Sequence, residues 1–125
     1  MFYFVEHSIA VIKPKQPFLD WINQNFKELP ENLSLETIRI DCNSYLIPEV
    51  DEIEDGISYI DQRFEDIFAI ELASWIEDES VWPQDLTLKM FLEWFDVEVF
   101  PTMIDLTDLE DTGEVQLARG SHSIH

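Results

Sequence analysis

The chain has 125 residues, and 27 Asp and Glu against 7 Lys and Arg give it a formal net charge of -20 at pH 7. Hydrophobic residues make up 46% of the sequence and aromatic residues 13%, more than a disordered acidic tail carries, so we expect a folded protein. Because phosphates repel an anionic surface, this composition argues against direct binding to nucleic acid or to an anionic membrane.

The length and the cysteine content predict one cytoplasmic domain. We expect a domain over residues 1–106 and a polar tail over residues 107–125. Cys42 is the single cysteine, so no intramolecular disulfide can form, and we interpret it as a small, inert hydrophobic residue. No stretch approaches the roughly 18 apolar residues of a membrane-spanning helix. The N-terminal residues also lack a signal-peptide pattern, which favours a reducing, cytoplasmic compartment.

The first half of the chain predicts two strands and two helices. Residues 2–12 are apolar and β-branched, as in a buried strand. Pro17 suits the first turn of an amphipathic helix, which Pro30 ends. Residues 34–38 fit either a short capped helix or an alternating strand, and we favour the helix. A second short strand is expected at residues 45–47.

The second half predicts a long helix, a short helix and a strand. Asp51 and Glu54 stand at the spacing of a capping box, and a long apolar stripe with helical periodicity follows them as far as Ile76. Residues 86–95 are apolar nearly all round, so we expect a short, deeply buried helix there. Residues 97–104 predict a third strand.

This order of elements predicts the fold class. We expect an α+β fold with a single layer of about three strands packed with three to four helices. Each connection between strands contains helix and is long enough to cross over, so the sheet could be mixed.

Catalytic and metal-binding patterns are absent from the sequence. Two of the three histidines lie in the predicted tail, and His7 has no partners for a catalytic triad. A single cysteine cannot supply a zinc site. Residues 51–56 end in a glycine like part of a calcium loop, but Ile53 occupies a ligand position and Gln62 stands where the bidentate Glu belongs. The sequence therefore predicts no metal and no cofactor, and it favours a non-enzymatic role.

The charge distribution carries the main functional hypothesis. Residues 49–114 contain 21 acidic residues and only Arg63 and Lys89 as basic residues. Such a field attracts a basic protein, such as a nucleic-acid-binding protein or a nuclease toxin, so the chain could be an immunity-type inhibitor or a DNA mimic. The predicted partner-binding residues are Glu49, Asp51, Glu52, Glu54, Asp55, Asp61, Glu65, Asp66, Glu77, Asp78 and Glu79.

A second hypothesis rests on the few cations. Lys13 and Lys15 flank Pro14 in the turn between the first predicted strand and the first predicted helix. With Gln16, they would bind an anionic small molecule if the chain is a ligand-binding domain or a small enzyme. A cleft with convergent polar groups would favour this alternative, and lysines directed into solvent would count against it. A homodimer through residues 97–104 is also open.

Four sequence segments carry a resemblance. They are KPKQPFLDW at residues 13–21, YLIPE at 45–49, SVWP at 80–83 and FLEWFDVE at 91–98. In this order they resemble a family of small, acidic, uncharacterised bacterial proteins. The resemblance implies a bacterial cytoplasmic source and a single domain, and it implies no mechanism because that family has no established activity. It makes the turn at residues 13–17 the first place to look for a shared site.

Overall fold

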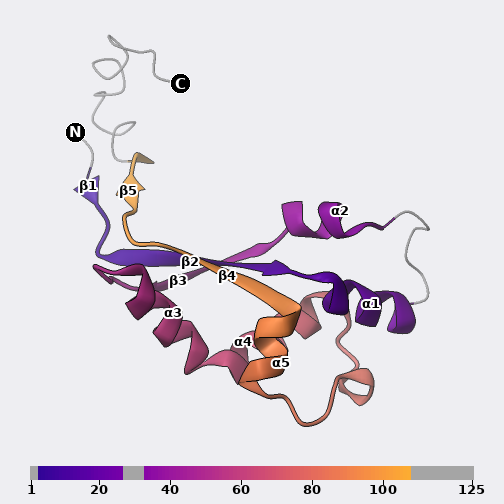
Figure 1. Ribbon diagram of the computed structural model, residues 1–125. Helices are drawn as coiled ribbons and strands as arrows, with labels where there is room; N and C mark the ends of the chain where they lie inside the picture. The colour runs from indigo at the N-terminus through magenta and orange to yellow at the C-terminus, as the bar shows by residue number, and fades with distance from the viewer. Residues whose placement is uncertain (1–2, 27–32, 108–125) are drawn as a thin grey trace.

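A three-stranded antiparallel sheet, in the order β3-β2-β4, lies at the centre of the fold (Figure 1). The computed structural model describes residues 3–26 and 33–107 of the chain. β2 (His7–Pro14) is the middle strand, and it pairs with β3 (Asn43–Pro48) on one side and with β4 (Phe95–Phe100) on the other. The predicted α+β class is confirmed.

The strand pairs are all antiparallel in the part of the chain that the structure describes. β1 (Tyr3–Phe4) and β5 (Ile104–Asp105) form a separate two-stranded ladder, which lies beyond one end of the central sheet in Figure 1. The parallel pairs that the sequence left open do not occur among these strands. The predicted first strand, at residues 2–12, corresponds to β1 and β2 together.

The helices lie on both sides of the sheet. In Figure 1, α3, α4 and α5 lie below the sheet, whereas α2 lies above it. The described residues form five α-helices, more than the three to four predicted, and one short 3-10 helix. These are α1 (Gln16–Asn25), α2 (Leu35–Ile40), α3 (Ile53–Asp61), α4 (Phe64–Trp75), η1 (Glu79–Val81) and α5 (Leu88–Trp94).

The core forms on the side of the sheet that faces α3, α4 and α5. Alternate residues of β2 are buried on this side, because successive side chains of a strand point to opposite faces. Four phenylalanines from four elements meet there: Phe18 lies 4.9 Å from Phe95, and Phe68 lies 5.8 Å from Phe91 and 5.4 Å from Phe95 between ring centroids. This cluster joins α1, α4, α5 and β4 through a single apolar contact surface.

Helix α3 approaches the sheet closely at Gly56. A Cβ atom added to Gly56 would lie 2.5 Å from Cγ1 of Val99, which is shorter than any ordinary contact between carbon atoms. Val99 lies in β4 and is buried. The missing side chain at position 56 therefore sets the distance between α3 and the sheet.

The other side of the sheet is less covered. Ile9 pairs with Leu46 on one side and with Phe100 on the other, so the three side chains form a row across this face. Leu46 is 61% exposed and Phe100 is 48% exposed. The predicted homodimer segment, residues 97–104, includes Phe100, and the homodimer stays a prediction.

The predicted long central helix is two helices. α3 ends at Asp61, and Arg63 leaves the helical region with φ -119° and ψ 21° before α4 begins. The predicted capping box is wrong, because the N-cap is Glu52 and its side chain makes no capping hydrogen bond. The break could not be read from the apolar stripe, since Ile60 and Phe64 keep a spacing of four residues across it.

The predicted deep burial of the last helix is also wrong. Phe91 is the buried residue of α5, whereas Leu92 is 40% exposed. A helix of two turns packs one side against its neighbours, so apolar residues on the opposite side stay in solvent.

The helix at residues 34–38 is confirmed as α2, where the hydroxyl of Ser34 accepts a hydrogen bond of 3.2 Å from the backbone N–H of Thr37. The predicted tail lies outside the described residues except for Thr107. Within the described ranges, the helices are too short or too polar to cross a bilayer.

Candidate functional site

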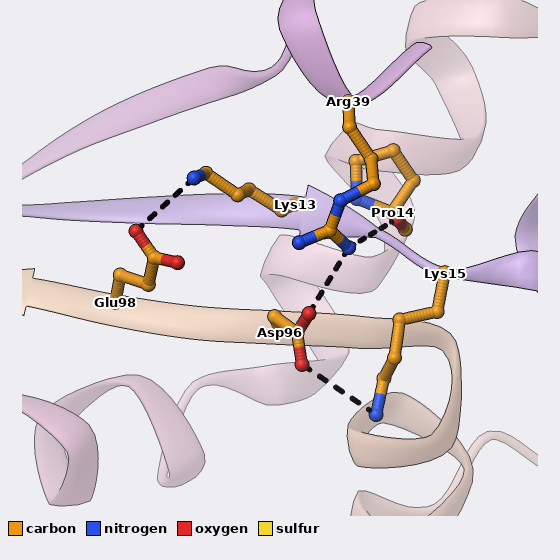
Figure 2. A network of polar contacts seen from close by, with 6 residues as sticks. All are labelled: Lys13, Pro14, Lys15, Arg39, Asp96 and Glu98. Carbon is orange, nitrogen blue, oxygen red and sulfur yellow. Dashed lines mark hydrogen bonds and ion pairs between the residues drawn. The ribbon is translucent and has the colours of Figure 1, made fainter. Parts of the chain in front are cut away.

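Three basic side chains meet two carboxylates at the end of β2 (Figure 2). Lys13 Nζ lies 3.3 Å from Oε1 of Glu98. Asp96 lies between two cations, with Oδ2 3.0 Å from Nη1 of Arg39 and Oδ1 3.7 Å from Nζ of Lys15. β2 and the start of α1 supply the lysines, α2 supplies the arginine and β4 supplies both carboxylates. We call these five residues the ion-pair network.

The backbone fixes the position of the ion-pair network. Arg39 Nη1 also donates to the carbonyl oxygen of Pro14 at 3.0 Å, and the backbone N–H of Lys15 donates to the carbonyl oxygen of Trp94 at 2.7 Å. All five charged side chains are partly exposed, so each pair contributes only about 0.2–1 kcal/mol to stability. The network mainly balances charge and holds α2 to the end of the sheet.

The predicted anion-binding residues do not converge on one cavity. Lys13 lines a groove of about 630 Å³ together with residues of α2, but neither Lys15 nor Gln16 lines it. The side chain of Gln16 instead donates to Asp20 at 2.8 Å. Both lysines already have carboxylate partners, so an anionic ligand at this turn would have to compete with Asp96 and Glu98.

The predicted partner-binding acids form an exposed set without basic partners. Ten of the eleven are exposed, and Asp61 is half-buried. The ion pairs between described residues all belong to the ion-pair network, so none includes these eleven carboxylates. The nearby Arg63 places its guanidinium carbon 3.6 Å from the centre of the Tyr59 ring. We call the eleven residues the acidic surface.

Two members of the acidic surface have perturbed carboxyl groups. Oδ1 of Asp61 is buried without a hydrogen-bond partner, and burial raises the pKa of this residue. Asp78 accepts hydrogen bonds from the hydroxyl of Ser80 at 2.7 Å and from its backbone N–H at 3.0 Å, which lower the pKa of Asp78. Asp78 thus also caps η1.

Glu71 is a buried carboxylate that was not predicted from the sequence. This residue lies in α4 and is only 3% exposed. Its Oε2 accepts a hydrogen bond of 2.5 Å from the hydroxyl of Tyr45 and one of 2.9 Å from Nδ2 of Asn43. One signal could have revealed it: Glu71 follows Ile67 by four residues and precedes Trp75 by four, so an acidic residue occupies the apolar stripe.

Burial is the main influence on the ionisation of Glu71 and Tyr45. Burial raises the pKa of Glu71, and the hydrogen bonds from Tyr45 and Asn43 oppose that effect. The pKa of Tyr45 is also raised, first by burial and then by its hydrogen bond to Glu71. Tyr45 therefore stays a hydrogen-bond donor at all ordinary pH values.

Glu71 opens onto a cavity of about 330 Å³ between α2, β3 and α4. Asn43 contacts two other residues of the cavity wall: its Nδ2 lies 2.9 Å from Oε2 of Glu71 and 3.4 Å from the hydroxyl oxygen of Ser74. The polar residues of the lining are Asp41, Asn43, Glu71 and Ser74. Cys42 and Trp75 also line the cavity.

No protein-family model, no curated protein and no solved structure matches the chain. The resemblance to a family of acidic bacterial proteins therefore stays a prediction. Within residues 3–26 and 33–107, no group of three or more His, Cys, Asp or Glu side chains could hold a metal ion.

Proposed function

We propose that the chain is an interaction module that binds a basic protein through the acidic surface. The observation that carries this proposal is the pairing of charges: the ion-pair network takes up Lys13, Lys15 and Arg39, and the acidic surface keeps its negative charges without basic partners among the described residues. Like charges held together on a folded surface repel one another, and a basic partner would relieve this repulsion.

The position of these acids suits rapid association. Glu54 and Asp55 lie in the first turn of α3, and Glu65 and Asp66 lie in the first turn of α4. Carboxylates there interact favourably with the helix dipoles, so the helices tolerate the charges. A cluster of one sign raises the rate at which an oppositely charged protein arrives, most strongly at low salt. We therefore propose a partner with a basic surface, bound mainly by electrostatics.

The test compares two variants that each lose four negative charges. The first replaces the four helix-turn acids with amides (Glu54→Gln, Asp55→Asn, Glu65→Gln and Asp66→Asn). The matched control replaces four exposed acids elsewhere (Glu6→Gln, Glu36→Gln, Asp85→Asn and Glu93→Gln). Each protein is immobilised, exposed to bacterial lysate at low salt and eluted with a salt gradient.

The expected result is a basic protein that the wild type and the control variant retain and that the first variant loses. Equal loss from both variants would show that only net charge matters, which would contradict binding through the acidic surface. Columns that retain no basic protein would remove the proposal altogether.

A further inference from the structure

One carboxylate oxygen of Glu71 accepts no hydrogen bond from the described part of the chain. Both hydrogen bonds to this side chain reach Oε2, from Asn43 and Tyr45. Among the described residues, only Oδ1 of Asp61 is a fully buried side-chain oxygen without a hydrogen-bond partner. Oε1 of Glu71 accepts no hydrogen bond from these residues either, so it is not fully buried and must contact open space. The cavity of about 330 Å³ that Glu71 lines supplies that space.

The surroundings of this oxygen suit a positive group. Two carboxyl residues, Asp41 and Glu71, line the cavity, and the described residues contribute no Lys, Arg or His to its lining. None of the ion pairs between described residues includes Glu71. A carboxylate that is 3% exposed and lacks a cation is costly, because burial removes water without supplying a countercharge.

The cavity also has the size and lining of a small ligand site. Its volume of about 330 Å³ lies at the lower end of the range for small-molecule pockets. Trp75 and Ile38 supply apolar wall, and aromatic rings favour neighbouring cations. Among the described residues no group of three or more His, Cys, Asp or Glu side chains could hold a metal ion, so we favour an organic cation over a metal.

We propose that this cavity binds a primary ammonium or guanidinium group, which donates a hydrogen bond to Oε1 of Glu71. Tyr45 and Asn43 hold Oε2, so the free oxygen is fixed in orientation before the ligand arrives. Ser74 and Asp41 offer further acceptors at the wall. The group is either a free small amine or a Lys or Arg side chain of another protein. This proposal does not depend on the acidic surface.

The test uses a charged ligand and a neutral ligand of the same shape. N-butylguanidinium and N-butylurea are titrated into the full-length protein at physiological salt, and binding is followed by NMR. The signals to follow are the side-chain amide of Asn43 and the indole N–H of Trp75. We expect saturable shifts of both signals with N-butylguanidinium and no saturation with N-butylurea.

Two variants distinguish binding in the cavity from general attraction to negative charge. Glu71→Gln keeps the side-chain shape and removes the charge, and it should weaken N-butylguanidinium binding about tenfold or more. Glu93→Gln removes an exposed charge at a residue that neither lines the cavity nor belongs to the acidic surface, and it should leave the affinity unchanged. If Glu71→Gln does not fold, the location of the shifts in the wild type still decides the question.

Three results would overturn the proposal: no saturation at Asn43 and Trp75, equal binding of N-butylurea, or shifts confined to the acidic surface. A blocked tripeptide, acetyl-Gly-Arg-Gly-amide, then distinguishes the two sources. Binding at least as tight as that of N-butylguanidinium supports a side chain of a partner protein. Binding of the small cation alone supports a free amine. Failure of the lysate experiment would leave these outcomes unaffected, because the probes are not proteins.

Discussion

Glu71 is the residue with the most unusual environment in the described structure. It is a buried carboxyl group in a helix whose other buried residues are apolar. Its hydrogen bonds come from β3, so the same contacts that satisfy Oε2 also hold α4 against the edge of the sheet. A single acidic side chain thus links helix packing to the polar cavity.

Ionisation of Glu71 should make stability depend on pH. Burial raises the pKa of Glu71 above its ordinary value of 4.5. As the pH rises past 4.5, the unfolded chain releases this proton before the folded protein does, so this residue's contribution lowers the free energy of unfolding until the pH exceeds the folded pKa. Glu71→Gln cannot release the proton. The stability of the variant relative to wild type should therefore increase as the pH rises through this window.

Urea unfolding over a series from about pH 4 to 8 measures this difference. Comparison of Glu71→Gln with the wild type cancels the contribution of Asp61, whose pKa is also raised by burial. Tyr45 remains protonated, and the variant keeps all the other residues that line the cavity. Glu65→Gln, on the exposed side of α4, is the control, because it removes one carboxylate of the same helix that does not line the cavity. A constant difference for Glu71→Gln would contradict the assigned cause.

Among the elements, α2 depends most on tertiary contacts. A helix of six residues is unstable alone, because nucleation costs more than so few hydrogen bonds return. The side chain of Ile38, a residue of α2, is buried. Arg39 joins the helix to β2 through Pro14 and to β4 through Asp96. Arginine suits this position because its guanidinium group can bond a carbonyl and a carboxylate together.

The packing of α3 on β4 leads to a second prediction. Alanine favours helices over glycine by about 1 kcal/mol, so Gly56→Ala would stabilise an isolated helix. Here the added methyl group meets Val99 at 2.5 Å, and displacement of a buried valine costs about 1–3 kcal/mol. We expect a net loss of stability in urea unfolding. Ser58→Ala, exposed on the same helix, should change stability by less than about 0.5 kcal/mol. A Gly56→Ala variant as stable as wild type would show that α3 packs less closely.

The sequence predicted the elements better than their limits and contacts. Helical periodicity identified α1, because one face of this helix is buried, whereas runs of apolar residues identified β2 and α5. The α3–α4 break escaped prediction because no Gly or Pro marks it and the apolar stripe continues through it. Tertiary contacts escaped for another reason: Glu71 is 26 residues from Tyr45, and Arg39 is 57 residues from Asp96. Each of these pairs joins a helix to a strand, so only the packing of α4 and α2 on the sheet brings the partners together.

The exposure of the acidic surface was easier to anticipate. Carboxylates are rarely buried without partners, so a strongly acidic chain must place most of them in solvent. The carboxylate partners of the cations could not be predicted in this way. Lys13 and Lys15 were recognised as a cluster, but the carboxylates that pair with them come from a strand more than 80 residues later.

For the whole molecule, repulsion between carboxylates competes with the ion-pair network. A net charge of -20 lowers the stability of a compact state, and added salt screens this repulsion. Salt also weakens the three partly exposed ion pairs, each worth about 0.2–1 kcal/mol at most. The larger number of unpaired carboxylates decides the balance, so the melting temperature should rise with salt.

Thermal melting in about 10 mM and about 150 mM NaCl tests this prediction, because the screening length falls from about 30 Å to about 8 Å. We expect an increase of several degrees in the wild type. The variant that lacks four charges of the acidic surface should show a smaller increase. A melting temperature that does not change with salt would show that the surplus charge does not destabilise the fold.

The contact between Gly56 and Val99 restricts how this protein can evolve. A side chain at position 56 requires space that Val99 occupies, so the first substitution at either position changes what the other tolerates. Descendants that acquire alanine at position 56 should carry a smaller residue at position 99, whereas lineages that retain valine should retain glycine. Sequence drift at these two sites, 43 positions apart, is thereby coupled through one methyl group.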